Sequence, residues 1–100
     1  MERLPDAFDD LCAALTSLDD RADVAAFLRD ACTLSELEAI CHRLEVARLL
    51  DEGGRTYLEI AREVGTSTTT VTRVAHWLRH GEGGYRIALE RYRRERASTG

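Results

Sequence analysis

The chain has 100 residues, 44% of them hydrophobic and 32% charged, with a formal net charge of −4 at pH 7. Such values are typical of one soluble globular domain, and we expect residues 1–100 to form a single domain. No run approaches the roughly 18 apolar residues that a helix needs to cross a bilayer, so we expect no membrane-spanning helix. Ala, Leu, Arg and Glu predominate and Pro5 is the only proline, which favours an all-α fold.

The three cysteines indicate a reducing compartment. Cys12, Cys32 and Cys41 are odd in number and widely spaced, and residues 1–20 are acidic and lack the apolar run of a secretion signal. We therefore expect a cytoplasmic protein without disulfides. Each cysteine falls on or near an apolar helical stripe, so we interpret all three as buried packing residues.

Charge is unevenly distributed along the chain. Residues 1–50 hold 5 Arg against 11 acidic residues, a balance of −6, whereas residues 51–100 hold 9 Arg against 7, a balance of +2. A mildly basic half beside an acidic half is the pattern of a phosphate-facing surface carried on an acidic scaffold. A solvated asymmetry without a partner gives the same pattern, so charge alone leaves both interpretations open.

Three helices are predicted in the acidic half. Apolar residues recur at helical spacing over Leu4–Ser17, and Asp19 and Asp20 offer caps for a second helix that extends to Ala31. Thr33–Glu36 has the spacing of a capping box and opens a third helix of about 18 residues, which Gly53-Gly54 ends.

The third helix is apolar on two sides. One stripe comprises Leu37, Ile40, Cys41, Leu44 and Ala47, and the second comprises Val46, Leu49 and Leu50. Both stripes need cover, and a chain of this length buries only a limited core. We therefore predict that a second copy of the chain supplies the extra cover, in a homodimer.

Residues 56–79 carry the pattern of a helix-turn-helix. Thr56–Glu59 has a second capping-box spacing, and the helix that it opens ends near Val64. Ser67 caps a further helix that runs to about Arg79. Only about three residues separate the two helices, as a helix-turn-helix requires.

The packing residues of this pair fit a steep crossing. Ala61 is small enough for close approach, and Gly65 accepts the positive φ of a tight turn. Val71, Val74 and Leu78 form the inward stripe of the second helix.

The outward face of that second helix predicts contact with DNA. Four threonines occur within Thr68–Thr72, although β-branching makes threonine a poor filler for an exposed helix. Threonine hydroxyls bind phosphates or base edges, threonine methyls meet thymine methyls, and a helix N-terminus attracts phosphate. We assign the major groove to Ser67, Thr68, Thr69, Thr72 and Arg73, and phosphate contacts to Arg55, Tyr57, Arg62 and Arg79. The alternative is a polar helix hairpin that binds no nucleic acid.

A last helix is predicted over Tyr85–Arg96, after a flexible break at Gly81–Gly84. It offers Ile87, Leu89 and Tyr92 for packing. Residues 97–100 are expected to fray.

Metal binding and catalysis find little support in the sequence. His76 and His80 lie four apart on one helical face, which is metal-ligand spacing, but no nearby Cys pair or acidic residue completes a site. No glycine-rich phosphate loop or nucleophile elbow occurs. We predict no metal, no cofactor and no enzymatic activity, with both histidines facing solvent or phosphate.

Several segments resemble the Trp repressor superfamily, in its YerC/YecD branch: Glu36–Leu50, Thr56–Leu78, Gly83-Gly84-Tyr85 and Leu89-Glu90-Arg91. The resemblance spans about residues 8–92 and is most specific at Arg43–Ala47 and Thr70–Val74. It implies a six-helix, all-α dimer with interleaved N-terminal helices and one helix-turn-helix from each subunit. It also implies transcriptional repression.

The same resemblance implies positions for an effector pocket. In the Trp repressor two arginines flank the tryptophan corepressor, and by motif they fall at Arg43 and Arg73. Small residues along the reading helix admit the indole there, whereas this chain has Val74 and Trp77. Trp77 follows Arg73 by four residues and lies on its side of the helix, so its indole is of a size and position to fill the space permanently. Binding of DNA is therefore predicted not to require L-tryptophan. The alternative is that Trp77 points elsewhere and packs against Tyr85 or the dimer partner, which leaves a different pocket open.

The combined prediction is a sequence-specific, homodimeric transcriptional repressor that binds double-stranded DNA on the bacterial nucleoid. The alternative is a protein-interaction module in which the acidic N-terminal half engages another protein and the helix-turn-helix is scaffold. Salt dependence of DNA binding separates the two, because phosphate contacts release counterions.

Overall fold

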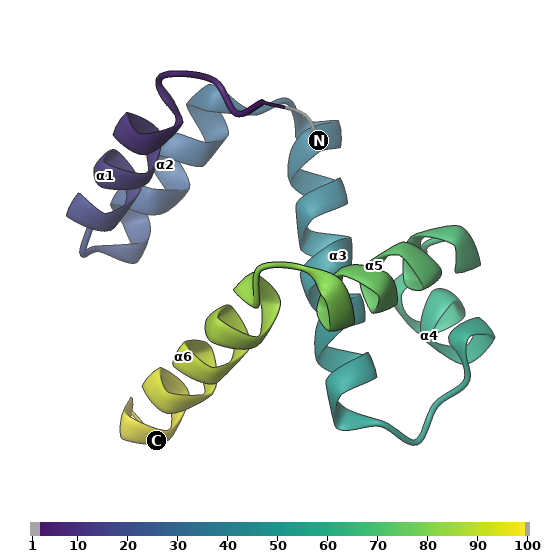
Figure 1. Cartoon of the computed structure of the whole chain (residues 1–100). Coiled ribbons are helices and arrows are strands. Elements are labelled where there is room, and N and C mark those ends of the chain that lie inside the picture. Colours follow the sequence, from purple (N-terminus) through teal and green to yellow (C-terminus); the bar gives the residue numbers. More distant parts are fainter. Residues whose placement is uncertain (1–2, 100) are drawn as a thin grey trace. The chain divides into compact units, whose positions relative to one another are not determined.

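The computed structural model describes residues 3–99 and contains, within them, six α-helices and no strand (Figure 1). The expectation of a six-helix, all-α chain is confirmed. No helix in this part of the chain is both long and apolar enough to span a membrane. The helices are α1 (Phe8–Ser17), α2 (Arg21–Ala31), α3 (Leu34–Glu52), α4 (Tyr57–Val64), α5 (Thr68–His80) and α6 (Gly84–Thr99).

Side-chain caps begin α2 and α3 where the sequence predicts them. The Asp20 carboxylate accepts a hydrogen bond of 2.8 Å from the Ala22 N–H. Thr33 and Glu36 form a reciprocal capping box, in which each backbone N–H donates to the other side chain, at 2.8 and 3.1 Å. The Thr33 N–H holds the pKa of Glu36 below its ordinary value, because these bonds favour the ionised carboxylate.

Two helices differ from the predicted bounds. The first begins at Phe8 rather than Leu4, because proline disfavours helical conformation in the residue before it, and Pro5 instead accepts a turn hydrogen bond from the Phe8 N–H. The last begins at Gly84 and continues through Thr99, past the expected end at Arg96. Fraying of residues 97–100 stays a prediction.

The chain separates into two compact units, residues 1–37 and 38–100, although we expect one domain. The first unit contains α1 and α2, joined by Leu18–Asp20, and neither helix has a buried residue. Phe8 and Leu11 of α1 are each 42% exposed. Within one chain, α1 and α2 therefore form no buried hydrophobic core of their own.

The second unit holds the hydrophobic core. Figure 1 shows α5 crossing α3, with α4 beside it. The core consists of fully or almost fully buried side chains from four helices: Val46, Ala47 and Leu49 of α3, Ile60 and Ala61 of α4, Val71 and Val74 of α5, and Leu89 of α6. Leu50, Val64 and Tyr85 pack against its edge. The core thus fixes the position of α5 against three other helices.

The apolar residues of α3 differ in how deeply they are buried in the single chain. The C-terminal part of the helix is buried, whereas Ile40 and Leu44 are 52% and 44% exposed. The expectation of buried cysteines is wrong for Cys12 and Cys41, which are exposed, and Cys32 is half-buried. All three lie on or next to faces that one chain leaves uncovered.

Candidate nucleic-acid interface

The first helix of the helix-turn-helix, α4, is fixed at both ends by local hydrogen bonds. At its start, the Thr56 hydroxyl accepts from the Glu59 N–H and the Glu59 carboxylate accepts from the Thr56 N–H, each at 3.1 Å. At its end, Gly65 adopts φ 83° and ψ 40°. The Gly65 and Thr66 N–H groups then both donate to the Ala61 carbonyl at 2.9 Å. The turn is therefore closed by backbone geometry that favours glycine.

The second helix, α5, begins at a serine cap and has one buried face. The Ser67 hydroxyl oxygen accepts from the Thr70 N–H at 3.1 Å. Val71, Val74 and Ala75 are buried, and Leu78 is half-buried. The predicted helix-turn-helix is confirmed within one residue at the end of α5, which closes at His80 rather than Arg79.

The opposite face of α5 presents the predicted major-groove residues to solvent. Ser67, Thr68, Thr69, Thr72 and Arg73 are all exposed. Two of the hydroxyls are already engaged: that of Ser67 in the cap and that of Thr72, which donates to the Thr68 carbonyl at 3.0 Å. The side chains of Thr68 and Thr69 have no hydrogen bond within residues 3–99. These two hydroxyls are accordingly the ones available to a ligand.

The charges of this surface are positive and largely unpaired. Helix α5 contains Arg73 and Arg79 and no acidic residue. Within the described chain, neither of these nor Arg62 forms an ion pair. Unpaired guanidiniums can bind phosphates without first breaking a protein ion pair.

Arg55, a predicted phosphate contact, is already engaged. It donates to Glu63 at 2.9 Å and to Glu52 at 3.3 Å, and only 30% of its side chain is exposed. Sequence reasoning missed both pairs because they join α3, the following loop and the end of α4. A contact with phosphate would have to compete with them.

Two of the other three predicted phosphate contacts, Tyr57 and Arg79, meet at a shallow pocket of about 200 Å³. Tyr57 and Arg79 line it together, with Arg86. The Arg86 guanidinium lies 3.5 Å from Asp51, which leaves Arg79 as the unpaired cation there. A tyrosine hydroxyl beside an unpaired guanidinium is suitable for an anionic oxygen.

The four predicted effector-pocket residues lie around one pocket. Arg43, Arg73, Val74 and Trp77 line about 280 Å³ of space, together with Thr70 and Tyr85. The expectation that Trp77 fills this space is not met in the single chain, because its side chain is 57% exposed and forms one wall. Sequence reasoning did not include Thr70 and Tyr85 in the pocket. The spacing of Thr70 and Trp77, two helical turns apart on α5, was the available signal for Thr70.

Comparison with known proteins agrees with this geometry. The profile of the family described as Trp repressor protein matches residues 6–93. The uncharacterized protein YerC of Bacillus subtilis (strain 168) is 42% identical over 83 residues, which are 83% of this chain and 79% of YerC.

Two solved structures have a similar fold. A TrpR-like protein from Eubacterium eligens ATCC 27750 superposes with a TM-score of 0.80 at 40% identity, covering 88% of this chain and 90% of the other. A Trp repressor candidate from Staphylococcus aureus gives 0.81 at 34% identity, covering 90% and 89%. The family profile, the YerC relative and the similar fold of the two solved structures together show that the chain belongs to the Trp repressor family, as a YerC-like member.

Proposed function

We propose that this chain is a sequence-specific DNA-binding regulator that acts as a homodimeric repressor on the bacterial nucleoid. The observation that carries the proposal is the exposed face of α5, which combines available hydroxyls and unpaired arginines with no acidic residue. Membership of the Trp repressor family, whose members are DNA-binding regulators, supports the same function. We propose no enzymatic activity.

The N-terminal half of α5 is the part that we assign to base recognition. Thr68 and Thr69 have available hydroxyls beside a helix N-terminus, where the helix dipole favours phosphate. The Arg73 guanidinium can donate two hydrogen bonds to the O6 and N7 atoms of guanine. Arg62, Tyr57 and Arg79 then supply phosphate contacts at the sides, which fix the orientation of α5 in the groove. Arg55 contributes only if it exchanges Glu63 for a phosphate.

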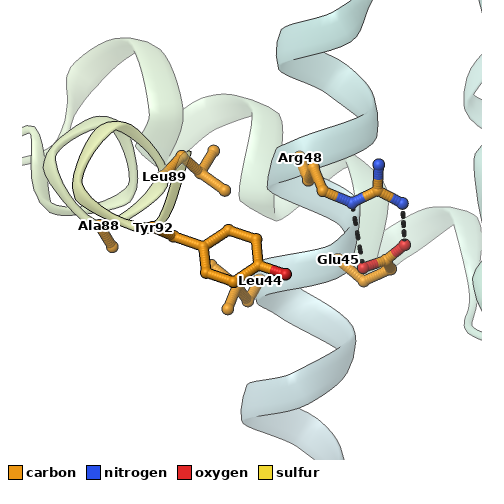
Figure 2. A pocket seen from close by; sticks show the side chains of 6 residues that line it. All are labelled: Leu44, Glu45, Arg48, Ala88, Leu89 and Tyr92. Carbon is orange, nitrogen blue, oxygen red and sulfur yellow. Dashed lines mark hydrogen bonds and ion pairs between the residues drawn. The ribbon is translucent and has the colours of Figure 1, made fainter. Parts of the chain in front are cut away.

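The dimer is supported by the apolar surface that one chain leaves uncovered. Figure 2 shows a groove between α3 and α6, in which Tyr92 and Leu89 face Leu44 and the Arg48–Glu45 ion pair borders the opening. Its volume is about 300 Å³. Burial of each Leu, Ile or Phe side chain stabilises a protein by about 1.5–3 kcal/mol. Burial of the apolar residues of this groove, and of Phe8 and Leu11, against a second chain therefore favours association of the two chains.

Charge complementarity supports a second copy as the partner. Residues 1–37 hold 3 Arg against 9 acidic residues, whereas α6 holds 5 Arg against 2 acidic residues. The acidic first unit of one chain and the basic α6 of another can therefore attract each other. In such a dimer the two α5 helices are expected about one DNA turn apart, roughly 34–36 Å.

The test is DNA binding by the parent and three alanine variants. A duplex is first selected by the parent protein from a randomised pool. Arg73→Ala is expected to weaken binding to that duplex by about 1–3 kcal/mol, if Arg73 reads a base bidentately. Thr69→Ala is expected to change the selected sequence more than the overall affinity.

Arg3→Ala is the matched control for lost charge. Arg3 pairs with Asp6 ahead of α1, on neither α5 nor the basic α6, so its replacement is expected to leave affinity within about twofold of the parent. If Arg73→Ala and Thr69→Ala bind the selected duplex as the parent does, α5 is not the reading helix.

The second candidate function is a protein-interaction module that uses the acidic first unit. The exposed apolar residues of α1 favour it, since they could bind another protein as well as a second copy. A slope of log affinity against log salt that is close to zero would favour this candidate, whereas several phosphate contacts give a steep negative slope.

A further inference from the structure

Two histidines on α5 lie outside the contacts proposed above. His76 and His80 are both exposed, and their ring centroids are 5.0 Å apart. The ring of His76 also meets the edge of Trp77, with centroids 4.9 Å apart. At 100° per residue, His76 and His80 project within about 20° of Thr69 on the helix. They therefore continue the proposed DNA-reading face toward the C-terminal end of α5.

We propose that His76 and His80 contact DNA phosphates when protonated, so that the affinity for DNA rises as pH falls. The inference rests on the proposed DNA-binding function and adds two contact residues and a form of regulation to it. Imidazole is the side chain whose charge ordinarily changes between about pH 5 and 8. A phosphate beside it favours the charged form.

The position of the histidines along α5 matches the depth of the groove. With a rise of about 1.5 Å per residue, His76 lies about 10 Å and His80 about 16 Å beyond Thr69. The major groove is about 8.5 Å deep. When Thr69 reaches the base edges with α5 pointing into the groove, the histidines are at or above the level where phosphates line the rim.

No carboxylate neutralises these imidazoles within residues 3–99. The helices packed on α5 are α4 and α6. Most of their acidic groups and those of α3 are engaged elsewhere: Glu36 with Thr33, Glu59 with Thr56, Glu63 with Arg55, Glu90 with Arg94, Glu45 and Glu52 with Arg48, and Asp51 with Arg86 and Arg93. Glu38 lies on α3 and forms no ion pair within residues 3–99, and Glu95 lies near the end of α6. Glu82 follows His80 by two residues and forms no ion pair. The other charged groups on α5 itself are Arg73 and Arg79, both cationic. The helices around α5 further carry Arg62, Arg43, Arg91 and Tyr85, of which all but Tyr85 are cationic.

Because protonation of the histidines favours the complex, DNA binding takes up protons. Uptake of protons with the DNA makes binding tighter as pH falls and weaker as pH rises. A dimer carries four such histidines. The salt dependence of binding is therefore also steeper at low pH, since each added phosphate contact contributes about 0.9 to the slope.

The experiment measures binding of the selected, fluorescein-labelled duplex by anisotropy at pH 6.0 and pH 8.0, in EDTA so that no metal bridges the rings. The parent is expected to bind about tenfold more tightly at pH 6.0, with a salt slope steeper by about 2 to 4. His76→Gln/His80→Gln is expected to reduce the pH effect to below about twofold. His76→Arg/His80→Arg, whose charge is permanent, is expected to bind tightly at both values.

His42→Gln is the matched control, since His42 lies on α3 rather than on the exposed face of α5. This variant is expected to keep the pH effect of the parent. Equal affinity of the parent at both pH values, or an unchanged pH effect in the double Gln variant, overturns the inference and leaves the DNA-binding proposal standing. Absence of binding to any selected duplex at either pH overturns the DNA-binding proposal itself.

Discussion

Trp77 stands at the edge of the pocket that Arg43, Arg73 and Val74 also line. Its indole is of the same kind and size as the ring of free tryptophan, and Val74 beside it is 98% buried and fixed in the core. The pocket remains open in the single chain, so the indole narrows the space from one side. A single bulky side chain, Trp77, thus reduces the space that a ligand could occupy beside Arg43 and Arg73.

We expect DNA binding to be independent of L-tryptophan, because a chain-borne indole already occupies a wall of the pocket. A ligand shifts a conformational equilibrium only through different affinities for the two states. Titration calorimetry with tryptophan is expected to give no heat of binding at micromolar concentrations, and affinity for the selected duplex is expected to change less than twofold. Micromolar binding of tryptophan coupled to tighter DNA binding would contradict this prediction.

The helices show which parts of the fold a sequence can predict. The bounds of α2, α3, α4 and α5 follow from caps and glycines, which are local signals, and the structure confirms them within one or two residues. The start of α1 was predicted too early because apolar periodicity continues across Pro5. Periodicity records which residues could share a face, whereas the backbone restriction at proline decides where the helix begins.

The site was predictable where it depends on one helix and less so where it depends on several. The exposed face of α5 follows from its period. The pairing of Arg55 with Glu63, and the position of Tyr85 beside Arg73, depend on how separate helices pack. A single sequence carries no direct signal for such contacts.

Gly65 gives a direct test of the turn between α4 and α5. Its φ is +83°, and a Cβ built there meets no atom within 4 Å, so the cost of a side chain is backbone strain alone. Gly65→Ala is expected to lower the free energy of unfolding by about 1–2 kcal/mol, measured by urea denaturation.

Gly84→Ala is the matched control for this substitution. Gly84 is the first residue of α6, and a Cβ there also meets open space, without a positive φ. Alanine at this position is expected to be neutral or to stabilise by up to about 1 kcal/mol. Equal effects of the two substitutions would show that the conformation of Gly65 does not hold the turn.

For the whole molecule, the main feature is that residues 1–37 form a unit whose helices α1 and α2 have no fully buried residue in their own chain. All of the core lies in the second unit. Two short helices that bury no hydrophobic core are not stable as a separate folded unit. The proposed second copy is what turns these helices into part of a folded protein.

Light scattering at micromolar concentration is expected to give about twice the chain mass of 11.2 kDa. Ile40→Asp is expected to reduce the mass toward that of one chain, since Ile40 is apolar, 52% exposed and outside the core. Leu58→Asp, at a similarly exposed leucine of α4 (49%), is expected to leave the dimer intact. A folded, monomeric parent protein would contradict the dimer proposal.

The coreless first unit also affects how the amount of active protein depends on synthesis. This unit leaves the ribosome before residues 38–100, and in the proposed dimer its apolar side chains stay uncovered until another chain arrives. Chains that wait are open to proteolysis, and pairing depends on the square of their concentration. Halving the synthesis rate then removes more than half of the dimer. A small change in the synthesis of this protein would consequently change the activity of a gene that it controls. That change would be sharper than the one caused by an equal change in a regulator that folds as a single chain.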